Sequence, residues 1–106
     1  MAHVDPDLSD VLKVLANPAR LQIMEWLRTA EESFSDYEPI ADRAEVGVCV
    51  THLAAKTGLA QSTVSTYMGS LERVGLVRST RVGKWTHYRR DEAQVGELIR
   101  RLQDHI

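Results

Sequence analysis

Apolar residues recur at helical spacing near the start of the chain and again after residue 17. Asp5 and Pro6 form a typical helix start, with Asp as the cap and Pro at the first helical position. An apolar stripe at i, i+3, i+4 and i+7 follows, made of Leu8, Val11, Leu12 and Leu15. Asn17 and Pro18 repeat the start signal before a second, strongly apolar segment that ends near Thr29. The pattern predicts two helices, the second of them in the core.

Residues 31–45 lack this periodicity and contain six acidic residues together with Pro39. We expect a long acidic connection, a kind of segment that is uncommon unless it is functional or mobile. Two roles remain open for it. It is either a solvated loop or a cap over a pocket, with Trp26, Phe34 and Tyr37, that admits an organic effector.

Helical spacing returns in two neighbouring segments. Residues 50–57 fit a short helix that Gly58 ends in a left-handed conformation. Residues 61–74 follow after a tight turn, and Gly75 stops them. The apolar stripe of this second segment consists of Val64, Met68 and Leu71. The two segments predict a helix-turn-helix pair.

After Gly75 the apolar period changes from helical spacing to two. Residues 76–82 and 85–90, separated by a Gly83-Lys84 turn, predict a β-hairpin. Residues 91–106 return to helical spacing with a narrow apolar stripe. The whole pattern predicts a winged helix-turn-helix fold, mainly α with a β-hairpin wing, of about five helices and two strands. This arrangement presents one helix to the major groove and the hairpin to the neighbouring backbone or minor groove.

The charge pattern supports a polyanion as the partner. The formal net charge is −2, but residues 56–90 carry seven Lys and Arg residues against a single Glu. Residues 1–55 carry four bases against ten acids. The basic segment coincides with the helix after the turn and with the hairpin, so it is a candidate nucleic-acid face. The alternative is a solvated surface on which bases cluster by chance.

Length and composition exclude several other classes. The 106 residues fit a single domain, 1–106, that combines DNA binding and dimerisation. With Cys49 as its one cysteine, the chain has no intramolecular disulfide, so its stability depends on packing and a partner subunit. No apolar run reaches the ~18 residues of a membrane span, and we expect a cytoplasmic protein. No nucleophile elbow, phosphate loop or paired metal-ligand motif is present, so we predict neither an enzyme nor a cofactor.

The outward face of residues 61–70 offers short hydroxyls and an amide without a negative charge. These groups can bond to phosphates or base edges. They are Gln61, Ser62, Thr63, Ser65 and Thr66. An ordinary solvent-exposed face would instead carry Lys and Glu at i, i+4 spacing.

Three segments of the chain resemble the ArsR/SmtB-type winged-helix transcriptional repressors: residues 15–23, 61–65 and 75–88. The three together, in this order and at these separations, are specific, whereas any one alone is weak. The resemblance runs from about Leu8 to the C-terminus. It implies a homodimer whose N- and C-terminal helices pack across a two-fold axis. It also implies a repressor that binds an inverted-repeat operator and releases it when an effector binds.

The resemblance implies DNA contacts at the five polar residues of the recognition helix and, on the wing, at Arg81 and Lys84. His87, also in the wing, is expected to contact DNA or solvent. This chain departs from the family pattern in three places. It has Ala60 where a Ser often caps the recognition helix, Tyr67 where a His is frequent, and Gly69 inside the helix.

The metal sites of the family are incomplete here. Arsenic and cadmium sensors carry Cys-Val-Cys-Asp-Leu where this chain has Cys49-Val50-Thr51-His52-Leu53, so one thiolate is replaced by Thr51. Zinc, cobalt and nickel sensors use the last helix, whose matching positions retain only Glu92 and His105. We therefore expect an effector that is not sensed through either site, and assign no metal ligand.

The sequence is also compatible with other modes of regulation. Cys49 is interpreted as a small buried residue, but Cys49 and His52 remain candidates for metal- or thiol-responsive sensing. His3, near the N-terminus, could add a ligand. A winged helix can also lose DNA binding and serve as a protein-interaction module, because fold alone does not fix function.

Overall fold

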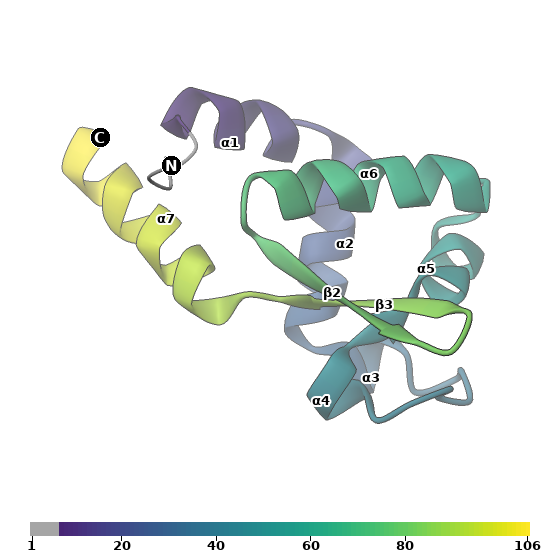
Figure 1. Ribbon diagram of the computed structural model, residues 1–106. Helices are drawn as coiled ribbons and strands as arrows, with labels where there is room; N and C mark the ends of the chain where they lie inside the picture. Colours follow the sequence, from purple (N-terminus) through teal and green to yellow (C-terminus); the bar gives the residue numbers. More distant parts are fainter. Residues whose placement is uncertain (1–6) are drawn as a thin grey trace.

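Helices with one apolar face surround a small antiparallel sheet (Figure 1). The computed structural model describes residues 7–106. Within these residues the elements follow in the order α1 (Leu8–Leu15), α2 (Pro18–Arg28), α3 (Ala30–Ser33), α4 (Arg43–Val46), β1 (Val48–Cys49), α5 (Val50–Thr57), α6 (Gln61–Arg73), β2 (Val77–Val82), β3 (Trp85–Arg90) and α7 (Glu92–His105).

Polar side chains cap the first two helices and fix where they begin. The Asp7 carboxylate accepts from the Ser9 N–H at 3.2 Å, so Asp7 is the N-cap of α1. The expected start at Asp5 and Pro6 lies outside the described residues. Asn17 caps α2 by accepting from the Arg20 N–H at 3.0 Å, as predicted. These caps satisfy N–H groups that a helix cannot pair internally.

The sheet has three strands in the order β1-β3-β2, all antiparallel. The hairpin pairs Val77 with Arg90 at its open end and Val82 with Trp85 at its turn. The two-residue strand β1 pairs with the other edge of β3, with Val48 opposite Tyr88 and Cys49 opposite His87. The sequence pattern did not predict β1, which places β3 in the centre of the sheet rather than at its edge.

The core fixes the orientation of α6. Val64, Met68 and Leu71 of its predicted stripe are fully buried, where they join Ile23 of α2 and Leu53 of α5. Each such buried side chain contributes about 1.5–3 kcal/mol relative to leaving it exposed. The opposite face of α6 is therefore held toward solvent.

The arginine of the family-like segment in α2 links three helices. The Arg20 Nε–H donates to the Val14 carbonyl at 2.6 Å, and its guanidinium lies 4.9 Å from the ring centroid of Tyr67. The hydrogen bond reaches the end of α1, and the cation–π contact reaches the middle of α6. Arg20 thereby helps to set the angle between α1, α2 and α6.

The acidic segment is exposed along most of its length, but the one-turn helices α3 and α4 and the buried Phe34 fasten it to the core. Phe34 is fully buried. Its ring centroid lies 6.2 Å from that of Trp26, which it meets edge-on, and 5.8 Å from that of Tyr37, to which it is tilted. The Arg43 guanidinium donates to the carbonyl oxygens of Phe34 and Tyr37 at 2.6 and 3.0 Å. The Lys56 ammonium lies over the Trp26 and Phe34 rings. Burial of one aromatic ring and one arginine anchors a segment whose composition indicated only its acidity.

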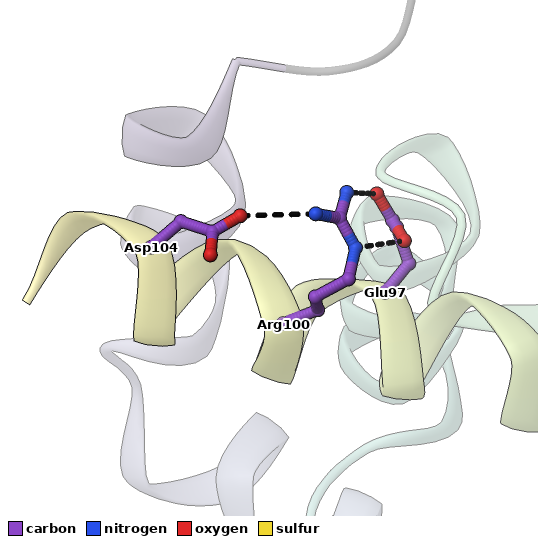
Figure 2. A network of polar contacts seen from close by, with 3 residues as sticks. All are labelled: Glu97, Arg100 and Asp104. Atoms are coloured by element: carbon purple, nitrogen blue, oxygen red, sulfur yellow. Dashed lines mark hydrogen bonds and ion pairs between the residues drawn. The ribbon is translucent and has the colours of Figure 1, made fainter.

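Helix α7 extends away from the rest of the fold beside α1 (Figure 1). Its exposed surface carries an ion network in which Arg100 bonds to Glu97 and donates to Asp104 at 2.9 Å (Figure 2). Opposite charges at these spacings of i, i+3 and i, i+4 lie side by side on a helix and support it where it is exposed to solvent. None of the helices between residues 7 and 106 is long and apolar enough to cross a membrane.

The predicted fold class is confirmed. The described residues contain seven helices and three strands, compared with the expected five and two. The two additional helices, α3 and α4, are one turn each and lie in the acidic segment. The additional strand β1 is two residues long.

Gly47 provides a test of how α4 is joined to β1. Its φ is +89°, and a Cβ there would lie 2.0 Å from the Tyr88 carbonyl oxygen. Gly47→Ala should lower the free energy of unfolding by about 2–5 kcal/mol, from strain and steric overlap together. Urea denaturation followed by circular dichroism measures this change.

Gly69→Ala is the matched control, because the Gly69 position in α6 has open space around its Cβ direction. It should raise the free energy of unfolding by about 0.5–1 kcal/mol through helix propensity. Equal effects of the two substitutions would contradict the close approach of Gly47 to β3.

Candidate nucleic-acid interface

The exposed face of α6 carries most of the predicted contact residues. Gln61, Ser62, Ser65 and Thr66 are exposed, and Thr63 is half-buried at the edge of this face. The face exists because the three buried stripe residues point the other way. Over its first two turns, residues 61–66, it therefore presents hydroxyl and amide groups without a carboxylate.

The hydroxyl groups of this face are not equivalent. The Thr66 Oγ1–H donates to the Ser62 carbonyl at 3.0 Å, and Ser70 likewise donates to the Thr66 carbonyl at 3.3 Å. Such back-bonding occupies the donor proton, so these two hydroxyls are left as acceptors. No bond of this kind is recorded for Ser62 or Ser65 within residues 7–106. Those two hydroxyls can donate to a phosphate.

The N-terminus of α6 is open. Its N-cap is Ala60, and no side chain accepts from the first N–H groups of the helix. The predicted absence of a hydroxyl cap is thus confirmed. Uncapped N–H groups and the positive end of the helix dipole favour an anion at this point. The start of α6 suits a phosphate.

The turn before α6 positions this end of the helix. Gly58 ends α5 with φ of 76°, and the Thr57 hydroxyl accepts from the Leu59 N–H at 3.2 Å. The Thr51 hydroxyl of α5 donates to the Gln61 side-chain carbonyl at 3.4 Å. This contact leaves the Gln61 NH₂ group available as a donor.

The wing brings the two predicted basic residues to its tip. Arg81 and Lys84 are both exposed, and Gly83 in the turn between the strands has φ of 60°. The Arg81 Nε–H donates to the Gly83 carbonyl at 3.2 Å, and the Lys84 ammonium lies 5.1 Å from the Trp85 ring centroid. Figure 1 shows the hairpin turn and the N-terminal end of α6 at the same end of the molecule. The predicted contact residues of helix and wing are thus gathered there.

Arg78, another base of the hairpin, has a structural role that the sequence did not indicate. Its Nε–H donates to the Asp91 carboxylate at 2.6 Å. Asp91 is buried and also caps α7, accepting from the Gln94 N–H at 3.1 Å. Burial alone raises the pKa of the Asp91 carboxyl, but the Gln94 N–H and the Arg78 guanidinium outweigh burial and hold that pKa below its usual value. The pair joins the wing to α7.

His87 does not contact solvent, and the sequence-based expectation for it is wrong. Its side chain is 1% exposed, and neither ring nitrogen has a hydrogen-bond partner among the described residues. The cause is the unpredicted strand β1, which makes β3 central and places His87 between Cys49 and Thr80. His87 is therefore removed from the candidate DNA contacts.

The two candidate sensing residues lie beside this histidine. Cys49 is buried, at 2% exposure. The ring centroid of His52 lies 5.1 Å from that of Tyr37. Burial lowers the pKa of the His52 imidazole, and the neighbouring Arg43 guanidinium lowers it further, so both effects favour the neutral ring. No group of three or more His, Cys, Asp or Glu side chains suited to a metal occurs in residues 7–106. His3 lies outside the described residues.

The fold and the polar face of α6 together define a winged helix-turn-helix protein, and comparisons with known proteins agree. Residues 21–81 match the model of the IclR helix-turn-helix domain. The chain is 41% identical over 97 residues to the HTH-type transcriptional regulator YbzH of Bacillus subtilis, a match that covers 92% of this chain and 96% of that protein.

Solved structures are similar as well. One is described as a possible transcriptional regulator for arsenical resistance, with 27% identity and a TM-score of 0.67, over 91% of this chain and 82% of that one. Another is the homodimeric winged helix-turn-helix DNA-binding domain of Mb0332 from Mycobacterium bovis, a possible ArsR-family regulator. It is 29% identical with a TM-score of 0.58, over 92% of this chain and 78% of that one.

The chain belongs to the winged helix-turn-helix transcriptional regulators, and its solved neighbours include one described as a possible ArsR-family regulator. It is a DNA-binding regulator and not an enzyme. The resemblance stated from the sequence is confirmed.

The joint between wing and α7 gives a testable dependence on pH. At pH 7, Asp91→Ala should lower the free energy of unfolding by about 1–2 kcal/mol, because it removes both the helix cap and the partner of Arg78. Asp91→Asn keeps a capping side chain and loses only the charge, so its effect should be smaller.

The sign of the pH effect follows from the lowered pKa of Asp91. A carboxylate with a depressed pKa contributes stability above its ordinary value of 3.8, and loses it as the pH falls through the folded-state value. Urea unfolding of the wild type and Asp91→Asn should therefore converge below pH 3.8. A constant difference between the two from pH 7 to pH 3 would rule out the charged pair.

Proposed function

We propose that this protein is a homodimeric repressor that binds an inverted-repeat operator and releases it when an effector binds. The observation that carries the proposal is the exposed Ser, Thr and Gln face of α6, at the same end of the molecule as the basic wing tip. In a winged helix the recognition helix enters the major groove. The paired copy would place a second α6 in the next major groove on the same side of the duplex.

The α6 residues divide into two roles in this proposal. The open helix N-terminus, Ser62 and Ser65 bind phosphates, because they offer unused donors. Gln61 and Thr63 lie at the first turn, where recognition helices contact base edges. Thr66 acts as an acceptor, since its proton is already donated to Ser62.

The wing contributes positive charge at its tip. Arg81 and Lys84 carry no carboxylate partner within residues 7–106. A cation without a partner can release a counterion from DNA when it binds a phosphate. Both residues therefore add sequence-independent affinity at the backbone or minor groove.

Removing the two wing charges tests DNA binding directly. Arg81→Ala and Lys84→Ala should each weaken binding to the DNA upstream of the protein's own gene, and reduce the steepness of its salt dependence by about 0.9 per lost phosphate contact. Fluorescence anisotropy on upstream and shuffled duplexes across a salt series measures both effects.

Lys13→Ala, checked by sedimentation to have the same oligomeric state as the wild type, is the control for charge, since Lys13 is exposed on α1, outside the wing. It should leave the salt slope unchanged. If the wing variants bind like the wild type, or the wild type binds both duplexes equally and weakly, the protein is an interaction module rather than an operator-binding repressor.

The apolar surface of α1 and α7 supports a dimer. Of the stripe on α7, only Leu98 is buried in the chain itself, while Ile99 is 53% exposed and Leu12 of α1 is 40% exposed. Apolar residues left open on two adjacent helices are typical of an interface. The Mycobacterium bovis domain, described as homodimeric, supports the same assembly. We assign the dimer interface to α1 and α7.

Placing a charge in this surface should separate the protomers. Ile99→Glu would bury an unpaired carboxylate in the dimer, which costs several kcal/mol, so the variant should sediment as a monomer at micromolar concentration. Its operator affinity should fall with it, because one half-site is then bound at a time. Ile40→Glu is the control, as Ile40 is also exposed, at 40%, but lies outside both helices. A dimer that survives Ile99→Glu would contradict this interface.

The effector of the proposed repressor acts outside the two familiar metal sites. Cys49 is buried, and no third His, Cys, Asp or Glu of residues 7–106 joins Cys49 and His52 in a group that could hold a metal ion. The alternative of a metal- or thiol-responsive repressor predicts a different outcome. It requires arsenite or peroxide to release the DNA in the anisotropy assay, and Cys49→Ser to prevent that release.

A further inference from the structure

A hollow beside the end of α2 has a lining rich in arginine. It has a volume of about 260 Å³ and lies between the end of α2, the segment of α3 and α4, and the last residues of β3. Its charged lining consists of Arg28, Arg43, Arg89, Arg90, Glu31 and Glu92. Four arginines against two glutamates leave an excess of positive charge. We call it the arginine hollow.

Two of the arginines are buried and incompletely bonded. The Arg43 side chain is 8% exposed and that of Arg90 is 11% exposed. Each has a buried Nε–H with no hydrogen-bond acceptor among the described residues. The nearest carboxylate oxygen to the Arg43 Nε, on Glu31, is 3.6 Å away, beyond hydrogen-bond distance. Leaving such a donor of a charged group unpaired is unfavourable.

The other bonds of these two arginines hold them in place. Arg43 donates to the Phe34 and Tyr37 carbonyls, and Arg90 donates to the Met24 carbonyl and pairs with Glu92 at 3.0 Å. Their side chains are thus fixed before any ligand arrives. Preorganised guanidinium groups are the usual partners of carboxylates and phosphates.

The remaining two arginines are open to solvent. Arg28 and Arg89 are exposed, and no ion pair or hydrogen bond joins either side chain to another residue of the range 7–106. They lie at the same hollow and can close onto a bound anion. The arginine hollow therefore combines two fixed cations with two adjustable ones.

We propose that the arginine hollow binds a small molecule carrying a carboxylate or phosphate group, and that this anion is the effector of the repressor. The second half of this statement rests on the proposed function. The volume is below the about 300–1,000 Å³ of sites for drug-sized ligands, and suits a metabolite-sized anion. The acidic segment thus does line a ligand site, through Glu31 and Arg43, but a polar one rather than the aromatic pocket considered from the sequence.

The strand β3 links the hollow to the DNA-binding end. It begins at Trp85 beside the wing turn and ends at Arg90 in the hollow. An anion that draws Arg89 and Arg90 together acts on the same strand that carries the wing. An effector can change operator affinity only if it binds the free and the DNA-bound forms differently. Strand β3 carries Arg89 and Arg90, whose positive charges a bound anion would neutralise.

The test measures anion binding without DNA. Amide chemical shifts of the wild-type protein are followed while inorganic phosphate, succinate or the neutral succinamide is added at constant ionic strength. Phosphate and succinate distinguish the two anion chemistries. We expect saturable shifts at Ala44, Gly47 and Tyr88 with at least one anion, and none with succinamide.

Two double variants locate the binding. Arg28→Gln with Arg89→Gln removes the exposed cations of the hollow and leaves its buried bonds intact; it should weaken binding about tenfold or more. Lys13→Gln with Arg73→Gln removes two exposed charges outside the hollow and should leave the anion-induced amide shifts unchanged. Shifts that do not saturate, that spread over the surface, or that respond equally to both double variants overturn the site.

The effector role is tested separately with the operator duplex. The anion that binds should lower operator affinity of the wild type about tenfold, and leave Arg28→Gln with Arg89→Gln unaffected. Operator binding that ignores the bound anion overturns the effector role. If the anion binds in the hollow but the anion-free protein does not prefer its upstream DNA, the proposed repressor function fails while the anion site stands.

Discussion

Burial of one side of α6 is the constraint on which the other features depend. Val64, Met68 and Leu71 are each fully buried, and they can be so in only one rotation of the helix. This rotation directs Ser62, Ser65 and the uncapped helix end outward. In a chain of 106 residues the core is thin, so few side chains share the task and each matters. The polar surface proposed to face DNA is thus a by-product of apolar packing on the other side of the same helix.

The periodic part of this fold could be predicted from the sequence, and the part made by distant contacts could not. Helical spacing located α1, α2, α5, α6 and α7, and period-two spacing located the hairpin. Strand β1 has two residues, too few for any alternation to be visible. Its pairing with β3 spans about forty residues of sequence, and such pairings have no local signal. The burial of His87 followed from that pairing and was missed with it.

The candidate site divides in the same way. The exposed polar residues of α6 and the basic wing tip followed from local patterns and family resemblance. The separate role of Arg78 did not, because a basic residue in a basic segment gives no sign that its partner is a buried helix cap. The arginine hollow was also invisible, since Arg28, Arg43 and Arg89 are far apart in the chain and are assembled only by the folded acidic segment. Composition counted these charges without showing where they meet.

Asp91 has a mechanical consequence beyond its contribution to stability. It stands between β3 and α7, binds Arg78 of β2 with one oxygen and the α7 N-terminus with the other. A single carboxylate therefore holds the joint between the wing and α7. In the proposed dimer α7 is part of the interface, so a rotation of one subunit against the other is transmitted through this joint to the wing tip. The stiffness of this joint then sets how much the spacing between the two operator half-sites can vary before a wing no longer contacts the DNA backbone.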